Sequence, residues 1–94
     1  TMGMKLHVEK ENGNYSPALL SGWNETADFI DRLSKVTDTW EGVHNEDMAE
    51  YEFYRQDLEN ALNCSELSES DKEIVRSILK ESDPENCVVY VSIF

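Results

Sequence analysis

Basic residues are scarce in this sequence. It has 8 Lys and Arg against 20 Asp and Glu in 94 residues, which gives a formal net charge of −12 and a pI near 4.3. Proteins bind nucleic acid mainly by neutralising its phosphates with Lys and Arg, so a chain this anionic would be repelled. The composition therefore excludes nucleic acid as a direct partner.

Long hydrophobic runs are also missing. The longest apolar run, residues 87–94, has the length of a β-strand and falls short of the roughly 20 residues that cross a bilayer. No apolar stretch follows the first residues, so we expect no signal peptide, no membrane partner and a cytoplasmic location. We interpret residues 1–3 as the remnant of an expression tag and residues 4–94 as one acidic α+β domain.

Residues that commonly carry catalysis are few. The chain has two histidines, His7 and His44, and two cysteines, Cys64 and Cys87, and their spacing resembles no metal-ligand motif. The acidic surroundings disfavour a reactive thiolate, and no glycine pattern resembles a phosphate-binding loop. In a reducing compartment we expect no disulfide. We therefore expect no catalytic residue, no metal, no cofactor and no enzymatic activity.

Alternation and turn signals predict a small sheet. Residues 5–10 alternate as a strand, Asn12-Gly13 is typical of a type I′ hairpin turn, and residues 15–20 would form the returning strand. Pro17 makes that strand short, irregular or an edge strand. The strongest strand covers residues 87–94. Both of its faces are apolar, so we expect it in the middle of the sheet, paired with the first strand.

Apolar residues at helical spacing predict three helices. The first covers about residues 24–37, and the second covers about residues 45–62. The third begins at a capping box formed by Ser70 and Glu73 and ends before Pro84.

The second of these helices is the ambiguous one. The alternation Tyr51-Glu52-Phe53 would also fit a short strand, but the length of the apolar pattern favours the helix. The expected fold is therefore α+β: a small antiparallel or mixed sheet of two or three strands, the N-terminal hairpin plus the C-terminal strand, covered on one face by three helices. The apolar stripe of the second helix consists of Met48, Tyr51, Tyr54, Leu58, Ala61 and Leu62.

Negative charge is concentrated in one segment. Residues 38–59 contain eight acids and one base, Arg55, for a net charge of −7. Such a field repels itself and raises the rate at which a cationic partner arrives. The alternative is that the acids only keep the protein soluble.

A wheel of the second predicted helix puts Phe53 opposite the apolar stripe. An exposed ring among carboxylates resembles an interface anchor with a charged rim; the alternative is that it covers a neighbouring loop or the first helix. Trp40 is a second candidate anchor, with core packing as its alternative. The predicted partner-binding residues are Asp38, Trp40, Glu41, Glu46, Asp47, Glu50, Phe53 and Asp57.

In size, charge and expected architecture the chain is similar to small anti-defence proteins of phages and mobile elements, such as anti-CRISPR and anti-restriction inhibitors, and to acidic immunity proteins that block toxin nucleases. Residues 70–94, a predicted helix followed by Glu85-Asn86-Cys87 and a strand, resemble the end of barstar; the rest of the chain does not match it, so we assign no family. The resemblance implies a non-enzymatic inhibitor whose carboxylates replace phosphates on the cationic nucleic-acid-binding surface of a basic protein, such as a nuclease or a nucleic-acid-binding effector. The alternatives are a structural or adaptor protein that forms a homodimer or larger homo-oligomer, and a small enzyme.

Overall fold

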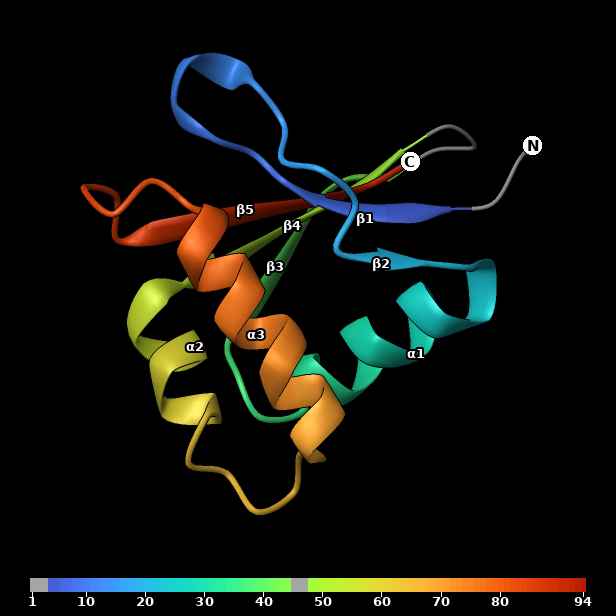
Figure 1. Cartoon of the computed structure of the whole chain (residues 1–94), viewed down its shortest axis with the longest axis vertical. Helices are drawn as coiled ribbons and strands as arrows, with labels where there is room; N and C mark the ends of the chain where they lie inside the picture. The colour runs from blue at the N-terminus through green and yellow to red at the C-terminus, as the bar shows by residue number, and fades with distance from the viewer. Residues whose placement is uncertain (1–3, 45–47) are drawn as a thin grey trace.

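The computed structural model describes residues 4–44 and 48–94 (Figure 1). Over this part of the chain the prediction of an α+β fold with three helices is confirmed. The strands and helices, in chain order, are β1 (Lys5–Val8), β2 (Leu20–Ser21), α1 (Trp23–Ser34), β3 (Thr39–His44), β4 (Ala49–Tyr54), α2 (Arg55–Ala61), α3 (Glu69–Glu81) and β5 (Val88–Ile93).

The strands form one antiparallel sheet in the order β2-β1-β5-β4-β3. The predicted number of two or three strands is wrong, because the described residues contain five. The predicted pairing of the first strand with the last is confirmed, and β5 lies in the middle of the sheet as expected. β2 has two residues and lies at the edge, in agreement with the expectation that Pro17 makes the returning strand short.

The predicted helix over residues 45–62 is wrong for most of its described length. Residues 49–54 are β4, and only Arg55–Ala61 are helical. Two interactions favour the strand over the helix. Because strand side chains alternate between faces, Ala49 and Phe53 both point into the core. In addition, β5 supplies hydrogen-bonding partners along the whole of β4. β3 completes the sheet by pairing with β4, and it covers residues that lie between the first two predicted helices.

The hairpin turn predicted at Asn12-Gly13 takes another form. Gly13 does adopt a positive φ of 76°, which glycine tolerates without strain. The segment Glu11–Gly13 is a short 3-10 helix within the long connection between β1 and β2, and no type I′ turn forms there. An isolated antiparallel β-bridge between Glu9 and Tyr15 joins the two arms of this connection.

Two helix boundaries also differ from the prediction. The first helix is shorter than expected and covers Trp23–Ser34. The N-cap of α3 is Ser68, whose hydroxyl accepts a hydrogen bond from the backbone N–H of Asp71 at 3.1 Å, so the capping box at Ser70 is wrong by two residues. α3 ends at Glu81, before Pro84, as predicted.

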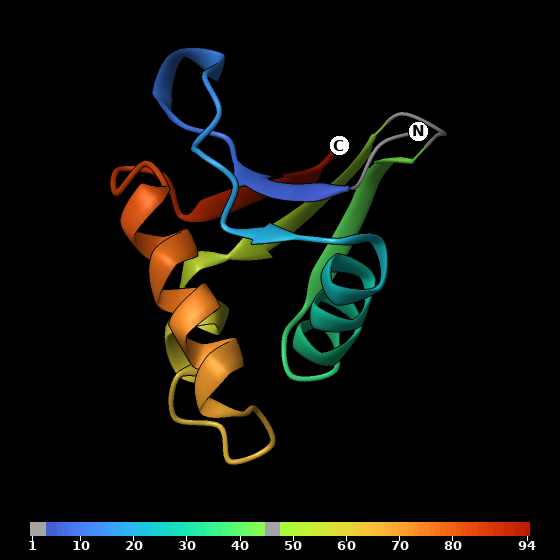
Figure 2. The same ribbon diagram turned by 45° about the vertical axis from the view of Figure 1, so that its right-hand side comes forward.

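All three helices lie on the same side of the sheet (Figure 2). One apolar core fills the space between them and the inward-facing strand residues. No helix in residues 4–44 and 48–94 has the length and apolar character needed to cross a bilayer. The buried core consists of Leu6, Val8, Phe29, Ile30, Leu33, Phe53, Leu58, Ala61, Leu67, Val75, Ile78, Val89, Val91 and Ile93.

Candidate functional site

The candidate site is the face of the sheet that points away from the helices, which we call the open face. Strand pairing places Trp40 on β3, Glu52 on β4 and Tyr90 on β5 in one row across this face. Directly opposed side chains on neighbouring antiparallel strands are about 5 Å apart at Cβ, so these three can interact. On one side of this row Tyr54 pairs with Val88, and on the other Glu50 pairs with Ser92.

Large aromatic side chains are exposed on the open face. Trp40 is 63% exposed, Tyr54 is 45% exposed and Tyr90 is 37% exposed. Packing in the core does not account for these rings, because the core lies on the opposite side of the sheet. Aromatic rings gathered on one open surface are typical of protein-binding sites.

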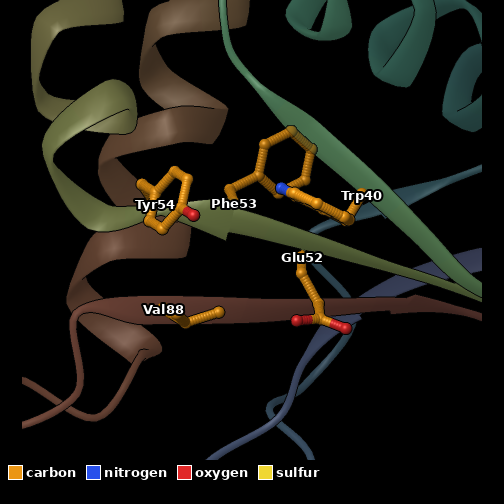
Figure 3. A pocket seen from close by; sticks show the side chains of 5 residues that line it. All are labelled: Trp40, Glu52, Phe53, Tyr54 and Val88. Atoms are coloured by element: carbon orange, nitrogen blue, oxygen red, sulfur yellow. The ribbon is translucent and has the colours of Figure 1, made fainter.

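Part of the open face is hollowed. Trp40, Glu52, Phe53, Tyr54 and Val88 line a depression of about 260 Å³, which we call the Trp40–Tyr54 hollow. Figure 3 shows the indole of Trp40 and the ring of Tyr54 projecting from neighbouring strands, with the Glu52 carboxylate extending over β5. A second hollow of about 390 Å³ adjoins it, is also lined by Trp40 and Tyr54, and adds Asp38.

The open face is electrostatically negative where its rings are. Within residues 4–44 and 48–94, the half-buried carboxylates of Glu50 and Glu52 make no side-chain hydrogen bond and no ion pair. The three arginines of the chain bind elsewhere, and Lys10, which lines a hollow with Tyr90, pairs with Glu81, so these cations do not offset this charge. The partners of the arginines are Asp71 for Arg32, the backbone carbonyls of Asp83 and Asn86 for Arg55, and Glu73 for Arg76.

A second aromatic group lies at the other end of the sheet, where β1 and β5 meet. The ring of His7 stacks on Phe94 with 4.3 Å between centroids, and Tyr15 contacts both rings edge-on. His7 Nδ1–H donates a hydrogen bond of 2.8 Å to the carbonyl of Ser16. These contacts fasten the long connection after β1 to the sheet and give His7 a structural role.

Two of the predicted partner-binding residues, Trp40 and Glu50, lie on the open face, and Asp38 lies at its margin in the second hollow. The prediction for Phe53 is wrong. Its side chain is 0% exposed and belongs to the core, because strand geometry points residue 53 to the side opposite Glu52. Its ring is therefore not available as an anchor for a partner.

The remaining predicted partner-binding residues are not placed on the open face by the structure. Glu41 is exposed on the helix side of β3, opposite Tyr51. Asp57 lies in the first turn of α2, and its carboxylate accepts a hydrogen bond from the backbone N–H of Asp38 at 3.1 Å. Glu46 and Asp47 lie outside the described residues.

Sequence reasoning missed three residues of this face: Glu52, Tyr54 and Tyr90. The signal was present in the alternation of residues 50–54, which places Glu50, Glu52 and Tyr54 on one side of a strand. The helical interpretation instead placed Tyr54 in the apolar stripe.

Within residues 4–44 and 48–94 no three His, Cys, Asp or Glu side chains gather in a geometry that could hold a metal ion. Both cysteines are free: Cys64 is half-buried and Cys87 is exposed. In comparisons with known proteins, no family model, no curated protein and no solved structure matches this chain.

Proposed function

We propose that this protein is an acidic inhibitor that acts by binding, without catalysis, and that its open face covers the cationic nucleic-acid-binding surface of another protein. The observation that supports the proposal is the row Trp40–Glu52–Tyr90, in which a carboxylate that makes no hydrogen bond or ion pair within the described residues stands between two exposed rings. This row lies on a sheet face that the helices leave free.

Such a row imitates the chemistry of a single-stranded nucleic acid. Proteins that bind single strands combine cationic grooves, which follow the phosphates, with surfaces on which bases stack. Glu50 and Glu52 supply anionic groups about 7 Å apart along one strand, since each residue rises about 3.4 Å. Trp40 and Tyr90 supply flat rings beside them. The net charge of −12 would steer the protein toward a basic surface.

The test uses a matched pair of charge reversals. Glu50→Lys/Glu52→Lys changes the open face, and Glu59→Lys/Glu66→Lys makes the same change in charge at exposed positions on α2 and in the turn after it. Each immobilised protein is incubated with the heparin-binding fraction of a nuclease-treated lysate from the cells that carry the gene. Captured proteins are identified by mass spectrometry.

We expect the unchanged protein and the Glu59/Glu66 variant to capture the same basic nucleic-acid-binding protein, and the Glu50/Glu52 variant to lose it. A single-stranded oligonucleotide should displace that protein, and rising salt should weaken its capture. Equal capture by the two variants, or no competition by the oligonucleotide, would contradict the proposal.

The adaptor alternative has one observation in its favour. β3 is an outer strand of the sheet, and within the described residues it pairs only with β4, so its other edge is open to a strand from a second copy. Sedimentation at increasing protein concentration separates the two functions. A homodimer that persists in high salt, together with no captured basic protein, would favour the adaptor.

A further inference from the structure

The Trp40–Tyr54 hollow has a composition that favours one class of ligand. It combines two exposed aromatic side chains with the carboxylate of Glu52, and Val88 supplies an apolar wall. An anion would be repelled by Glu52, and a purely apolar group would leave that carboxylate without a donor. A cation satisfies both parts, because aromatic faces attract cations and the carboxylate accepts their hydrogen bonds.

Two features strengthen the attraction for a cation. Glu52 is half-buried and has no ion-pair or hydrogen-bond partner of its own in the described chain, so its charge acts on whatever enters the hollow. Asp38 lines the adjoining hollow together with the same two rings, so a second acidic residue lies beside Trp40 and Tyr54. Both acidic residues therefore favour a cation at the rings.

The chemistry of the lining residues distinguishes between the two cationic side chains. A guanidinium is flat, so it can lie against an indole while its edge donates hydrogen bonds to a carboxylate. An ammonium is compact and strongly hydrated, and gains less from a half-open aromatic surface. The methylene groups of an arginine would also find Val88 beside them.

We infer that the Trp40–Tyr54 hollow is the receptor for an arginine side chain of the cationic partner. The guanidinium stacks on Trp40, its N–H groups bind Glu52, and Tyr54 bounds the hollow on the other side. This inference rests on the proposed function, because it names the residue of the partner that the open face recognises.

The test uses blocked hexa-arginine and hexalysine peptides as probes and nitrogen-edited NMR of the protein. The chain has two tryptophans, and their indole N–H signals report on two places: Trp40 on the open face, and Trp23, which is 64% exposed at the start of α1. We expect hexa-arginine to shift the Trp40 signal in a saturable way and to leave the Trp23 signal nearly unchanged. We expect hexalysine, at equal charge, to bind at least about threefold more weakly.

Matched variants locate the contact. Glu52→Gln keeps the shape of the side chain and removes its charge, so the apparent Kd for hexa-arginine should rise about fivefold to tenfold. Glu59→Gln makes the same change in net charge on α2 and should alter the Kd by less than about twofold. Trp40→Phe should retain part of the affinity, and Trp40→Leu should lose it. Dispersed backbone amide signals verify that each variant is folded, and they follow the titration in the two Trp40 variants, which lack the Trp40 indole signal.

The outcomes distinguish this inference from the proposed function. Equal affinity for the two peptides, or equal effects of Glu52→Gln and Glu59→Gln, would overturn the arginine receptor even if capture of a basic protein depends on Glu50 and Glu52. If hexa-arginine binds as expected but no such protein is captured, the receptor stands and the inhibitory function is wrong.

Discussion

Arg32 on α1 donates two hydrogen bonds to the carboxylate of Asp71 on α3, from Nε at 2.7 Å and from Nη2 at 3.0 Å. The hydrogen bond to Asp71 raises the pKa of the Arg32 guanidinium above its usual value. The carboxylate is nearly buried, with a side-chain exposure of 4%, whereas the guanidinium is half exposed. The pair joins two helices that lie far apart in the sequence.

Replacing Asp71 with Ala should therefore lower the free energy of unfolding by about 1–2 kcal/mol, because a bidentate charged contact between helices is lost and solvent already screens Arg32. Urea unfolding followed by circular dichroism measures the change. Glu73→Ala removes the exposed partner of Arg76 on the same helix and should cost less than about 0.5 kcal/mol. Equal losses of unfolding free energy in the two variants would show that the Arg32–Asp71 contact stabilises the fold no more than the exposed Arg76–Glu73 pair.

The opposite faces of β3 and β4 predict opposite effects for two aromatic residues. Phe53 is fully buried, so Phe53→Ala should cost about 3–5 kcal/mol, and the milder Phe53→Leu less than about 1.5 kcal/mol. Trp40→Ala should change stability by less than about 0.5 kcal/mol and weaken binding of hexa-arginine. Thermal unfolding and the NMR titration measure the two effects. A loss of stability in Trp40→Ala comparable to that in Phe53→Ala would contradict the assignment of Trp40 to the open face.

The raised pKa of the Tyr51 phenol leads us to expect a loss of stability in alkaline solution. Burial, with the nearby charges of Glu41 and Asp31, raises the pKa of its phenol above the usual value of about 10. The folded protein therefore holds this proton where the unfolded chain releases it, so stability is intact below pH of about 10 and falls as the pH rises further.

Tyr51→Phe removes that proton and should flatten the alkaline decline of the unfolding midpoint. Tyr15→Phe, at an exposed position, is the control and should follow the unchanged protein. Denaturant midpoints measured from pH 9 to 11.5 test this expectation, which fails if both variants decline like the unchanged protein.

The start of α3 gives a further prediction. Ser68→Ala removes the hydroxyl that accepts from the Asp71 N–H and should cost about 1 kcal/mol. Ser70→Ala should cost clearly less, because Ser70 lies in the first turn of the helix and its described side-chain contact is with Ser68. Denaturant unfolding of the two single variants settles which serine caps the helix; a larger loss for Ser70 would restore the capping box predicted from the sequence.

The C-terminal strand and the third helix could be predicted from the sequence because each has a local pattern that fits one element type. β5 carries apolar residues on both faces, which is the signature of a central strand. α3 carries one apolar face and stops before Pro84. In both cases the local pattern and the tertiary environment agree, so the outcome depended little on distant contacts.

The β3–β4 hairpin could not be predicted in the same way. Tyr51 and Tyr54 are three positions apart and, with Leu58, match a helix, yet in the structure they project from opposite sides of one strand. The choice depended on β5, a segment more than thirty positions away that pairs with β4 along its whole length. The error moved Phe53 to the surface and hid the row of residues that forms the candidate site, because strand and helix periods assign the same residue to different faces.

The helices cover one side of the sheet, so the residues that maintain the core and the residues that can contact a partner lie on different sides of it. Residues that point toward the helices must keep their volume and shape, since any change there is felt as lost stability. Residues on the other side, such as Trp40 and Tyr90, are not part of the core, so changes there have little effect on stability. That side can exchange its side chains and acquire a new target while the architecture beneath it persists.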